Sequence, residues 1–190
     1  SVCWENHPAL WHSALQWPGP ESHKYTRGFA LVVGGGAETT GAARLAARAA
    51  LRIGAGIVSV ACPPVALPTY AADLVSVMTK VVSSTEDLLA YARDRRRNAV
   101  LIGPGCGVTD LTRSHTLGLL GLGKPCVLDA DALSVFADAP PVLFDALNEN
   151  CILTPHDGEF SRLFPGIAGS RLERARAAAA ACGAVVLLKG

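Results

Sequence analysis

The sequence has almost no net charge. Its 190 residues include 17 Lys and Arg and 16 Asp and Glu, which gives a formal charge of +1. A protein that binds nucleic acid or an acidic membrane surface usually carries a clear excess of basic side chains. We therefore expect neither nucleic acid nor a membrane as a partner, and a small molecule is the better candidate.

Long apolar runs are missing as well. The longest runs, such as 184–188, have the length of one strand and fall far below the roughly 20 residues that a membrane span needs. The first residues show no signal-peptide pattern. Because half of the residues are apolar, we expect a globular protein with one sizeable core.

No two cysteines have the C-x-x-C spacing that is typical of zinc sites and redox motifs. The six cysteines are scattered, and four of them lie in or beside apolar runs, where a free thiol behaves as a small hydrophobic side chain. A disulfide framework or a zinc site is the alternative. We predict reduced thiols, no metal bound by the protein alone and a cytoplasmic location.

From residue 28 onward, short apolar runs alternate with helical stretches. Most of the runs are apolar at consecutive positions, which is typical of strands that helices cover on both faces of a parallel sheet. The pattern therefore predicts an α/β fold with strands at 30–33, 57–61, 77–82, 99–102, 126–128, 151–153 and 184–188.

Helices are expected at 41–53, 83–95, 111–122, 141–147 and 170–182. Two of them open on a Ser that stands three residues before a Glu, which is the pattern of a capping box. These pairs are Ser83 with Glu86 and Ser170 with Glu173. The arginines of 41–53 recur every fourth residue, which favours a solvated helix face over a phosphate clamp.

Residues 1–27 hold all three tryptophans and show little periodicity. We expect an irregular arm there, followed by one domain over 28–190. The side chains of Trp4, Trp11 and Trp17 have two possible roles: they pack on the surface of the same domain, or they dock on a neighbouring subunit.

Four loops of unusual composition follow predicted strands, at 34–42, 103–107, 128–133 and 154–159. Glycines let a ligand approach the backbone, and the amides at a helix start can bind an anion. A plain turn is the alternative for the first loop, and helix capping is the alternative for Asp131. Loops at the carboxyl ends of parallel strands form ligand clefts. The loops therefore predict a cleft for a phosphate-bearing ligand.

Six stretches of the chain, taken in order, resemble the NAD(P)H-hydrate dehydratase family, a carbohydrate-kinase-related family with the ribokinase-like fold. They cover nearly the whole chain. They are HKYTRG at 23–28, TGAARLAARAALRIGAGIVSVACP at 40–63, LIGPGCG at 101–107, VLDADAL at 127–133, LTPHDGEFSRLFP at 153–165 and LLKG at 187–190.

The resemblance implies a three-layer α/β/α domain with a mostly parallel sheet and a metabolite-repair activity. Such an enzyme dehydrates the 6-hydroxy forms of NADH and NADPH, called NADHX and NADPHX, at the expense of ADP or ATP. Magnesium would neutralise the phosphoryl group that is transferred. A homotetramer would also fit the resemblance.

The resemblance also assigns residues to the site. Ala42, Gly105 and His156 would contact the hydrated nicotinamide nucleotide. Lys189 and Gly190 would open the loop that holds the adenine nucleotide. The second choices, as neighbours of phosphate or of metal-bound water, are Asp129, Asp131 and Glu159.

One motif of the family is absent from these 190 residues: a Gly-Thr/Ser-Gly-Asp turn, whose amides form an anion hole and whose Asp is the catalytic base. We expect it beyond Gly190, so that 28–190 would be a dehydratase domain without its C-terminal part. Loss of even one oxyanion donor can cost about 10²-fold in rate. The chain alone is therefore predicted to be inactive or nearly so, with no catalytic residue of its own.

Two alternatives stay open. A vitamin or sugar kinase of the same fold is one, although such kinases are not expected to carry LTPHDGEF beside LDADAL. The other is a non-catalytic protein that binds nucleotides or a partner.

Overall fold

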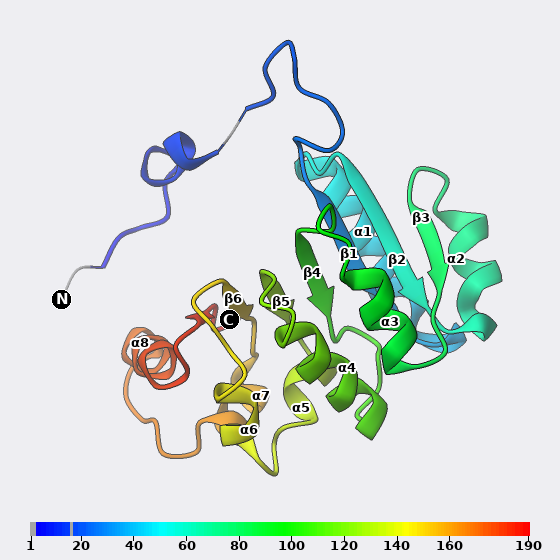
Figure 1. Ribbon diagram of the computed structural model, residues 1–190. Helices are drawn as coiled ribbons and strands as arrows, with labels where there is room; N and C mark the ends of the chain where they lie inside the picture. Colours follow the sequence, from blue (N-terminus) through cyan, green and yellow to red (C-terminus); the bar gives the residue numbers. More distant parts are fainter. Residues whose placement is uncertain (1–2, 16) are drawn as a thin grey trace.

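The computed structural model describes residues 3–15 and 17–190, and within them seven strands form one sheet (Figure 1). Every neighbouring pair is parallel, and the order is β3-β2-β1-β4-β5-β6-β7. Each strand overlaps a predicted one, which confirms the α/β class. The strands are β1 Phe29–Val33, β2 Ile57–Cys62, β3 Met78–Val81, β4 Ala99–Ile102, β5 Cys126–Leu128, β6 Cys151–Leu153 and β7 Val185–Val186.

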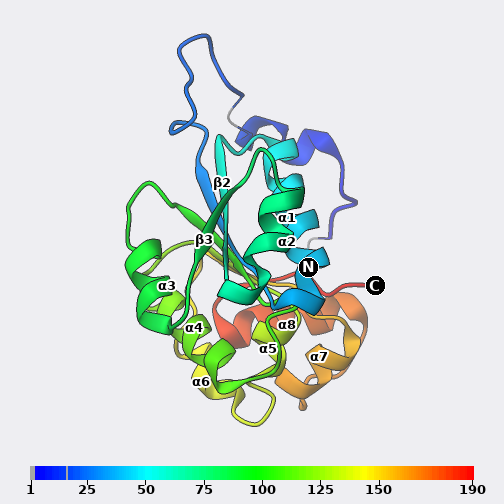
Figure 2. The ribbon, with the colours of Figure 1, turned by 90° about the vertical axis from the view of Figure 1, so that its right-hand side faces the viewer.

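Helices lie on both faces of the sheet, so the domain has three layers (Figure 2). On one face, α1 (Thr40–Ile53) and α2 (Leu67–Asp73) bury a core over β1 and β2. On the other face, a larger core extends from β1 to β6. The helices associated with it are α3 Thr85–Ala92, α4 Asp110–Leu120, α5 Asp131–Ser134, α6 Pro140–Phe144, α7 Asp157–Leu163 and α8 Arg171–Cys182.

The arginine stripe of α1 joins two helices. Arg44 and Arg48 form ion pairs with Asp73 of α2, at 2.9 and 2.8 Å. Gly54, with φ of 122°, ends the helix in a conformation that other residues rarely adopt. The stripe is therefore structural, and a phosphate clamp is not needed to explain it.

The N-cap of α3 lies one residue later than predicted. Ser84 is the N-cap, and its hydroxyl accepts a hydrogen bond from the Asp87 amide at 3.1 Å. Asp87 in turn accepts from the Ser83 amide, so the predicted pairing of Ser83 with Glu86 is wrong. The helix ends at Ala92, short of the expected residue 95. The box of Ser170 and Glu173 at the start of α8 is confirmed.

The arm carries two short 3-10 turns, Pro8–Leu10 and His12–Ala14, and extends away from the sheet (Figure 1). Trp4, Trp11 and Trp17 are all exposed. Trp4 and Trp17 are 71% and 68% exposed, so packing on the same domain covers only a minor part of these two side chains, whereas Trp11 is 42% exposed. Trp17 lines a cavity of about 720 Å³ between the arm and the amino ends of β1 and β4.

The cysteines are free, as predicted, and four of them lie in the core: Cys62, Cys126, Cys151 and Cys182. Over 3–15 and 17–190, each helix is too short or too polar to span a membrane. The same residues bring together no group of three His, Cys, Asp or Glu side chains that could ligate a metal ion.

Candidate active site

The sheet has a topological switch point between β1 and β4. These strands are hydrogen-bonded neighbours, although β2 and β3 separate them in the chain. The connection from β1 carries α1 on one face, and the connection from β4 carries α4 on the other. In open α/β sheets, ligands bind in the crevice at the carboxyl ends of strands at such a point. The four predicted loops follow β1, β4, β5 and β6 and meet at this edge.

The loops after β1 and β4 pack against each other. Thr39 donates a hydrogen bond from its hydroxyl to the carbonyl oxygen of Gly105, at 2.7 Å. A Cβ atom on Gly35 would lie 1.8 Å from that same oxygen, and Gly105 itself has φ of +76°. Contact between the two loops therefore explains both glycines, which supports the plain-turn alternative for the first loop.

The loop after β5 holds two aspartates around a strained residue. Ala130 has φ of 49° and is the one non-glycine with positive φ among the described residues. Asp131 accepts a hydrogen bond from the Gly107 amide at 2.8 Å. It is the first residue of α5 and makes no capping bond, so the capping alternative is wrong. Through this hydrogen bond, Asp131 instead stabilises the loop that contains Gly105.

Asp129 forms an ion pair with Lys189, with 2.6 Å between Oδ1 and Nζ. The backbone of Lys189 is held as well, because its amide donates to the Pro155 carbonyl and its own carbonyl accepts from Arg171. Both residues line a groove of about 430 Å³. The groove is lined by Ala42, Leu45, Ala46, Leu101, Pro104, Val127, Asp129, Thr154, Leu187 and Lys189.

His156 is the N-cap of α7. Its Nδ1 accepts from the amides of Gly158 and Glu159, at 2.9 and 3.3 Å, so this hydrogen-bond pattern assigns the ring proton to Nε2. That nitrogen lies 3.4 Å from Oε1 of Glu159, while Oε2 of Glu159 accepts from the His156 amide. Glu159 is buried by this capping box, whereas more than half of the His156 side chain is exposed. The imidazole therefore keeps an exposed edge, while its Nε2 lies beside the Glu159 carboxylate.

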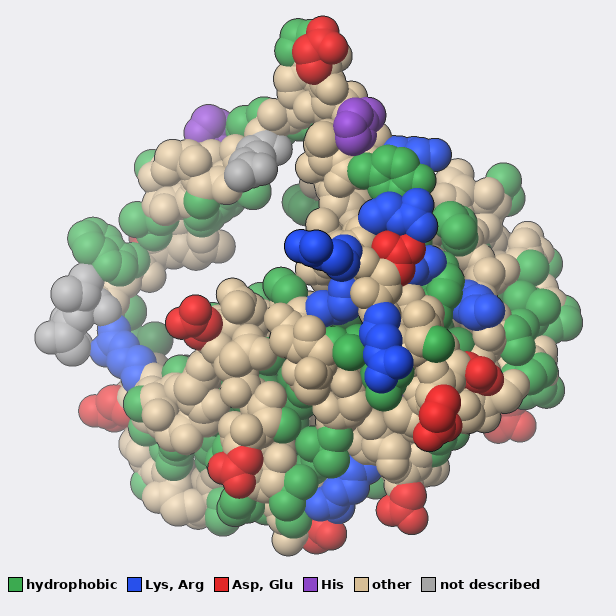
Figure 3. Space-filling view, viewed as in Figure 1, with side chains coloured by type: hydrophobic (Ala, Val, Ile, Leu, Met, Phe, Trp, Pro, Cys, Tyr) green, Lys and Arg blue, Asp and Glu red, His purple; other side chains and the backbone are tan. Residues whose placement is uncertain are grey.

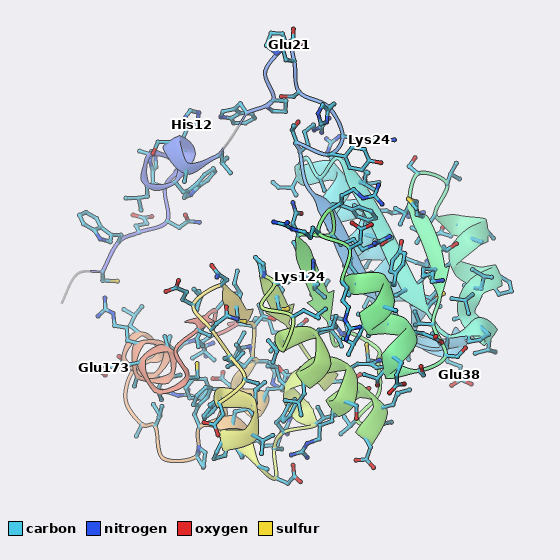
Figure 4. All side chains as sticks on the ribbon, in the orientation of Figure 1. His12, Glu21, Lys24, Glu38, Lys124 and Glu173 are labelled. Atoms are coloured by element: carbon cyan, nitrogen blue, oxygen red, sulfur yellow. The ribbon has the colours of Figure 1, made fainter. Side chains whose placement is uncertain are left out.

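Basic side chains gather elsewhere, at the amino ends of the strands (Figure 3). Lys24 and Lys124 lie on that side, and Glu38, in the turn before α1, lies on the opposite side (Figure 4). Lys124 donates to the carbonyl of Arg97, whose guanidinium lies 3.5 Å from the centre of the Tyr91 ring. These cations are engaged in structural contacts and lie away from the loops of the candidate site.

Comparison with known proteins decides the family. The sequence profile of a family described as NAD(P)H-hydrate dehydratase matches residues 30–190. The chain belongs to the NAD(P)H-hydrate dehydratase family.

Relatives in this dehydratase family have chains longer than these 190 residues. The bifunctional NAD(P)H-hydrate repair enzyme Nnr of Coxiella burnetii is 38% identical over 82% of this chain, which spans 30% of that relative. The ADP-dependent (S)-NAD(P)H-hydrate dehydratase of Neisseria meningitidis is 35% identical over 98% of this chain and 66% of its own. The chain therefore spans between about a third and two thirds of the length of these relatives.

Solved structures agree on the fold. An ADP/ATP-dependent NAD(P)H-hydrate dehydratase from Bacillus subtilis, co-crystallised with ATP and Mg²⁺, superposes with a TM-score of 0.73 at 30% identity. The match covers 93% of this chain and 62% of that one. A ribokinase-like superfamily protein from Enterococcus faecalis has a TM-score of 0.76 at 20% identity, over 92% of this chain and 61% of its own. The fold is thus ribokinase-like, as expected.

Within this dehydratase-family domain, the structure brings three predicted residues into one groove: Ala42, Asp129 and Lys189. Gly105 lies in the neighbouring loop, one residue after Pro104 of the groove. His156 and Glu159 do not line the groove but follow Thr154, which does. Gly190 directly follows Lys189 and lies outside the groove lining.

Three residues of the site were missed from the sequence: Thr39, Thr154 and Arg171. Thr39 supports the Gly105 carbonyl, Thr154 lines the groove, and Arg171 holds the Lys189 carbonyl. Thr39 and Thr154 lie within the predicted loops 34–42 and 154–159, so their position was a usable signal. Arg171 lies in α8, and no local pattern links it to Lys189.

Proposed function

We propose that the protein contributes its groove to the dehydration of hydrated NADH or NADPH, at the expense of ADP or ATP. The observation that carries the proposal is the meeting of Ala42, Asp129 and Lys189 in one groove at the switch point of a dehydratase-family sheet. The Neisseria relative is named as ADP-dependent, and the Bacillus relative as ADP/ATP-dependent. In this proposal Ala42, Gly105 and His156 face the hydrate, and Lys189 and Gly190 face the nucleotide.

The chemistry follows from the leaving group. Hydroxide leaves carbon poorly, whereas phosphate leaves readily, so transfer of a phosphoryl group from the nucleotide to the 6-hydroxyl prepares the elimination. The C6–O bond then breaks with its electron pair going to phosphate, and loss of a ring proton restores the nicotinamide double bond. The ammonium of Lys189 can stabilise phosphate oxygens as a point charge, and Asp129 holds it in place.

Magnesium fits this site as a companion of the nucleotide. Mg²⁺ at nucleotide sites is usually held by phosphates together with one or two carboxylates. The described residues offer no cage of three ligands, but they place Asp129 beside the groove and Asp131 in the same turn. These two carboxylates would hold the ion or its water, and the ion would supply charge neutralisation at the phosphoryl group.

The remaining expectations are part of the proposal. We infer a cytoplasmic protein, because free cysteines suit a reducing compartment. Residues 1–27 would form an arm and 28–190 the dehydratase-family domain. The assembly would be a homotetramer, which sedimentation velocity can test.

Ligand binding tests the proposed role of the groove without requiring turnover. Isothermal titration with hydrated NADPH, NADPH and ADP should give measurable affinity for the hydrate and for ADP. A preference for the hydrate over NADPH of about tenfold, which corresponds to one hydrogen bond to the added hydroxyl, would support the assignment. Equal affinity for the two, or no binding of either, would contradict it.

A further inference from the structure

A separate cavity of about 290 Å³ lies at the carboxyl ends of β1, β2 and β3. Its walls are the turn 34–36 after β1, the prolines 63–64 after β2, residues 82–83 after β3 and the first turns of α4. Small-molecule sites usually have volumes of about 300–1,000 Å³. The cavity is therefore at the lower end of that range and suits a ligand of one or two fused rings.

The cavity and the groove lie on opposite faces of the sheet. Val33 and Val82 line the cavity, and both belong to the larger core beneath α4. Leu101 lines the groove and packs against the core of α1 and α2. The loop after β4 borders both, because Pro104 lines the groove and Cys106 lines the cavity. The cavity is therefore a site apart from the groove.

His115 of α4 brings an unpaired nitrogen to the cavity. Its side chain lines the cavity and is 9% exposed, and among the described residues Nε2 has no hydrogen-bond partner. The imidazole also bonds to the Ser84 backbone, which assigns that bond to Nδ1. Burial lowers the pKa of His115, so the ring is neutral and Nε2 is an acceptor. A buried polar atom without a partner is costly, so Nε2 requires a donor from outside the protein.

The rest of the lining is apolar or uncharged. None of the described residues that line the cavity is an Asp, Glu, Lys or Arg. Val33, Val82 and Leu111 supply apolar side chains, and the turn 34–36 consists of glycines, so it presents backbone groups. Apolar walls with a few placed polar groups are typical of sites for neutral organic ligands. A phosphate or a carboxylate would find no cation here.

We propose that this cavity binds a neutral nitrogen heteroaromatic ring with an exocyclic amino group, such as adenine, whose N–H donates to Nε2 of His115. An aliphatic amine would be protonated at neutral pH and would lack a carboxylate partner, whereas an amino group on such a ring stays neutral. The ring nitrogens can accept hydrogen bonds from backbone N–H groups, which the turn 34–36 supplies. The proposal does not depend on the proposed function of the groove.

Titration calorimetry with adenine and with purine tests the proposal, because purine lacks the amino group. We expect adenine to bind with a Kd below about 1 mM, and purine about tenfold more weakly for want of one hydrogen bond. His115→Leu should weaken adenine binding about tenfold and leave purine binding unchanged. Thermal unfolding checks that this variant folds. Adenosine is titrated in parallel: affinity equal to that of adenine indicates the base of a nucleoside as the ligand, and loss of affinity indicates the free base.

Two exposed leucines give matched variants that do not alter His115. Leu111 is 51% exposed and lines the cavity, whereas Leu45 is 69% exposed and lines the groove. Leu111→Trp should block adenine binding, and Leu45→Trp should leave it unchanged. Three results would overturn the proposal: no binding of adenine, equal affinity for adenine and purine, which would leave water as the partner of Nε2, or equal losses from the two Trp variants.

Discussion

His156 has two separable functions at the scale of a single residue. Its Nδ1 caps α7, and in the proposed function the exposed edge of its ring contacts the hydrate. His156→Ala removes both, and loss of the cap should cost about 1 kcal/mol of unfolding free energy. His156→Asn should keep the cap, because Asn is a preferred N-cap residue. Both variants should bind hydrated NADPH at least about tenfold more weakly by titration calorimetry, with ADP affinity little changed.

The Asn variant is therefore the informative one for His156. In thermal unfolding, His156→Asn should be more stable than His156→Ala. In hydrate binding, the two variants should be equally weak. If His156→Asn binds the hydrate as well as the unaltered chain does, the side chain is a capping residue only.

Gly35 and Gly36 are adjacent in the chain but differ in how closely other atoms surround them. A Cβ atom on Gly35 would lie 1.8 Å from the Gly105 carbonyl oxygen, whereas one on Gly36 would meet nothing within 4 Å. Gly35→Ala should therefore lower the free energy of unfolding by roughly 2 kcal/mol or more, because two loops must separate. Gly36→Ala should change it by less than about 0.5 kcal/mol. Urea unfolding measures both, and equal stability of the two variants would contradict the observed packing of the loops.

His115 should make stability depend on pH. Burial lowers the pKa of His115, and a bond to the Ser84 backbone and the charge of Glu86 oppose this only in part. The unfolded chain therefore takes up a proton near pH 6.5, before the folded protein does. The stability from this group is fully present above about pH 6.5 and is lost as the pH falls towards the lower folded pKa. Urea unfolding should show that His115→Gln loses less unfolding free energy than the unaltered chain does between about pH 7.5 and pH 5. If the unfolding free energy of both proteins depends on pH in the same way, the prediction is contradicted.

At the scale of the element, the turn from Asp129 to Asp131 holds three parts of the site together. It contacts Gly103, bonds the Gly107 amide and pairs with Lys189. Its centre, Ala130, has φ of 49° and ψ of −116°, a combination that favours glycine. The turn therefore stores strain where it positions two carboxylates.

Ala130→Gly should release that strain. The conformation costs about 1–3 kcal/mol for a residue with a Cβ atom, while glycine costs about 0.5–1 kcal/mol in chain entropy. We expect a net gain of about 1 kcal/mol in unfolding free energy by urea titration. Ala132→Gly, in the buried part of α5, is the control and should destabilise the protein by about 1 kcal/mol. A loss of stability in Ala130→Gly would show that the turn is not strained.

The elements differ in how well their sequence predicts them. Most strands were predictable because they are short apolar runs between turns, whereas α2, with seven residues and Pro68 near its start, carries little periodic signal. The start of α3 was ambiguous, since Ser83-Ser84 and Glu86-Asp87 offer two capping pairs in adjacent registers. The meeting of Asp129 with Lys189, 60 residues apart, depends on sheet order and has no local signal.

At the scale of the whole molecule, helices cover the two faces of the sheet unequally. One face is buried from β4 to β6, and the other is buried only as far as α1 and α2 extend. The groove of the candidate site opens onto the uncovered part. The residues of the proposed site therefore border a partly exposed face of the sheet.

The most direct measurement is recovery of reduced-nicotinamide absorbance from hydrated NADPH, with magnesium and ADP or ATP. These 190 residues should bind hydrated NADPH, yet recovery should be slower by about 10²-fold or more than with the Neisseria relative, because the Gly-Thr/Ser-Gly-Asp turn that the family resemblance implies is not among them. Recovery at the rate of the relative, or no binding of the hydrate, would contradict the account.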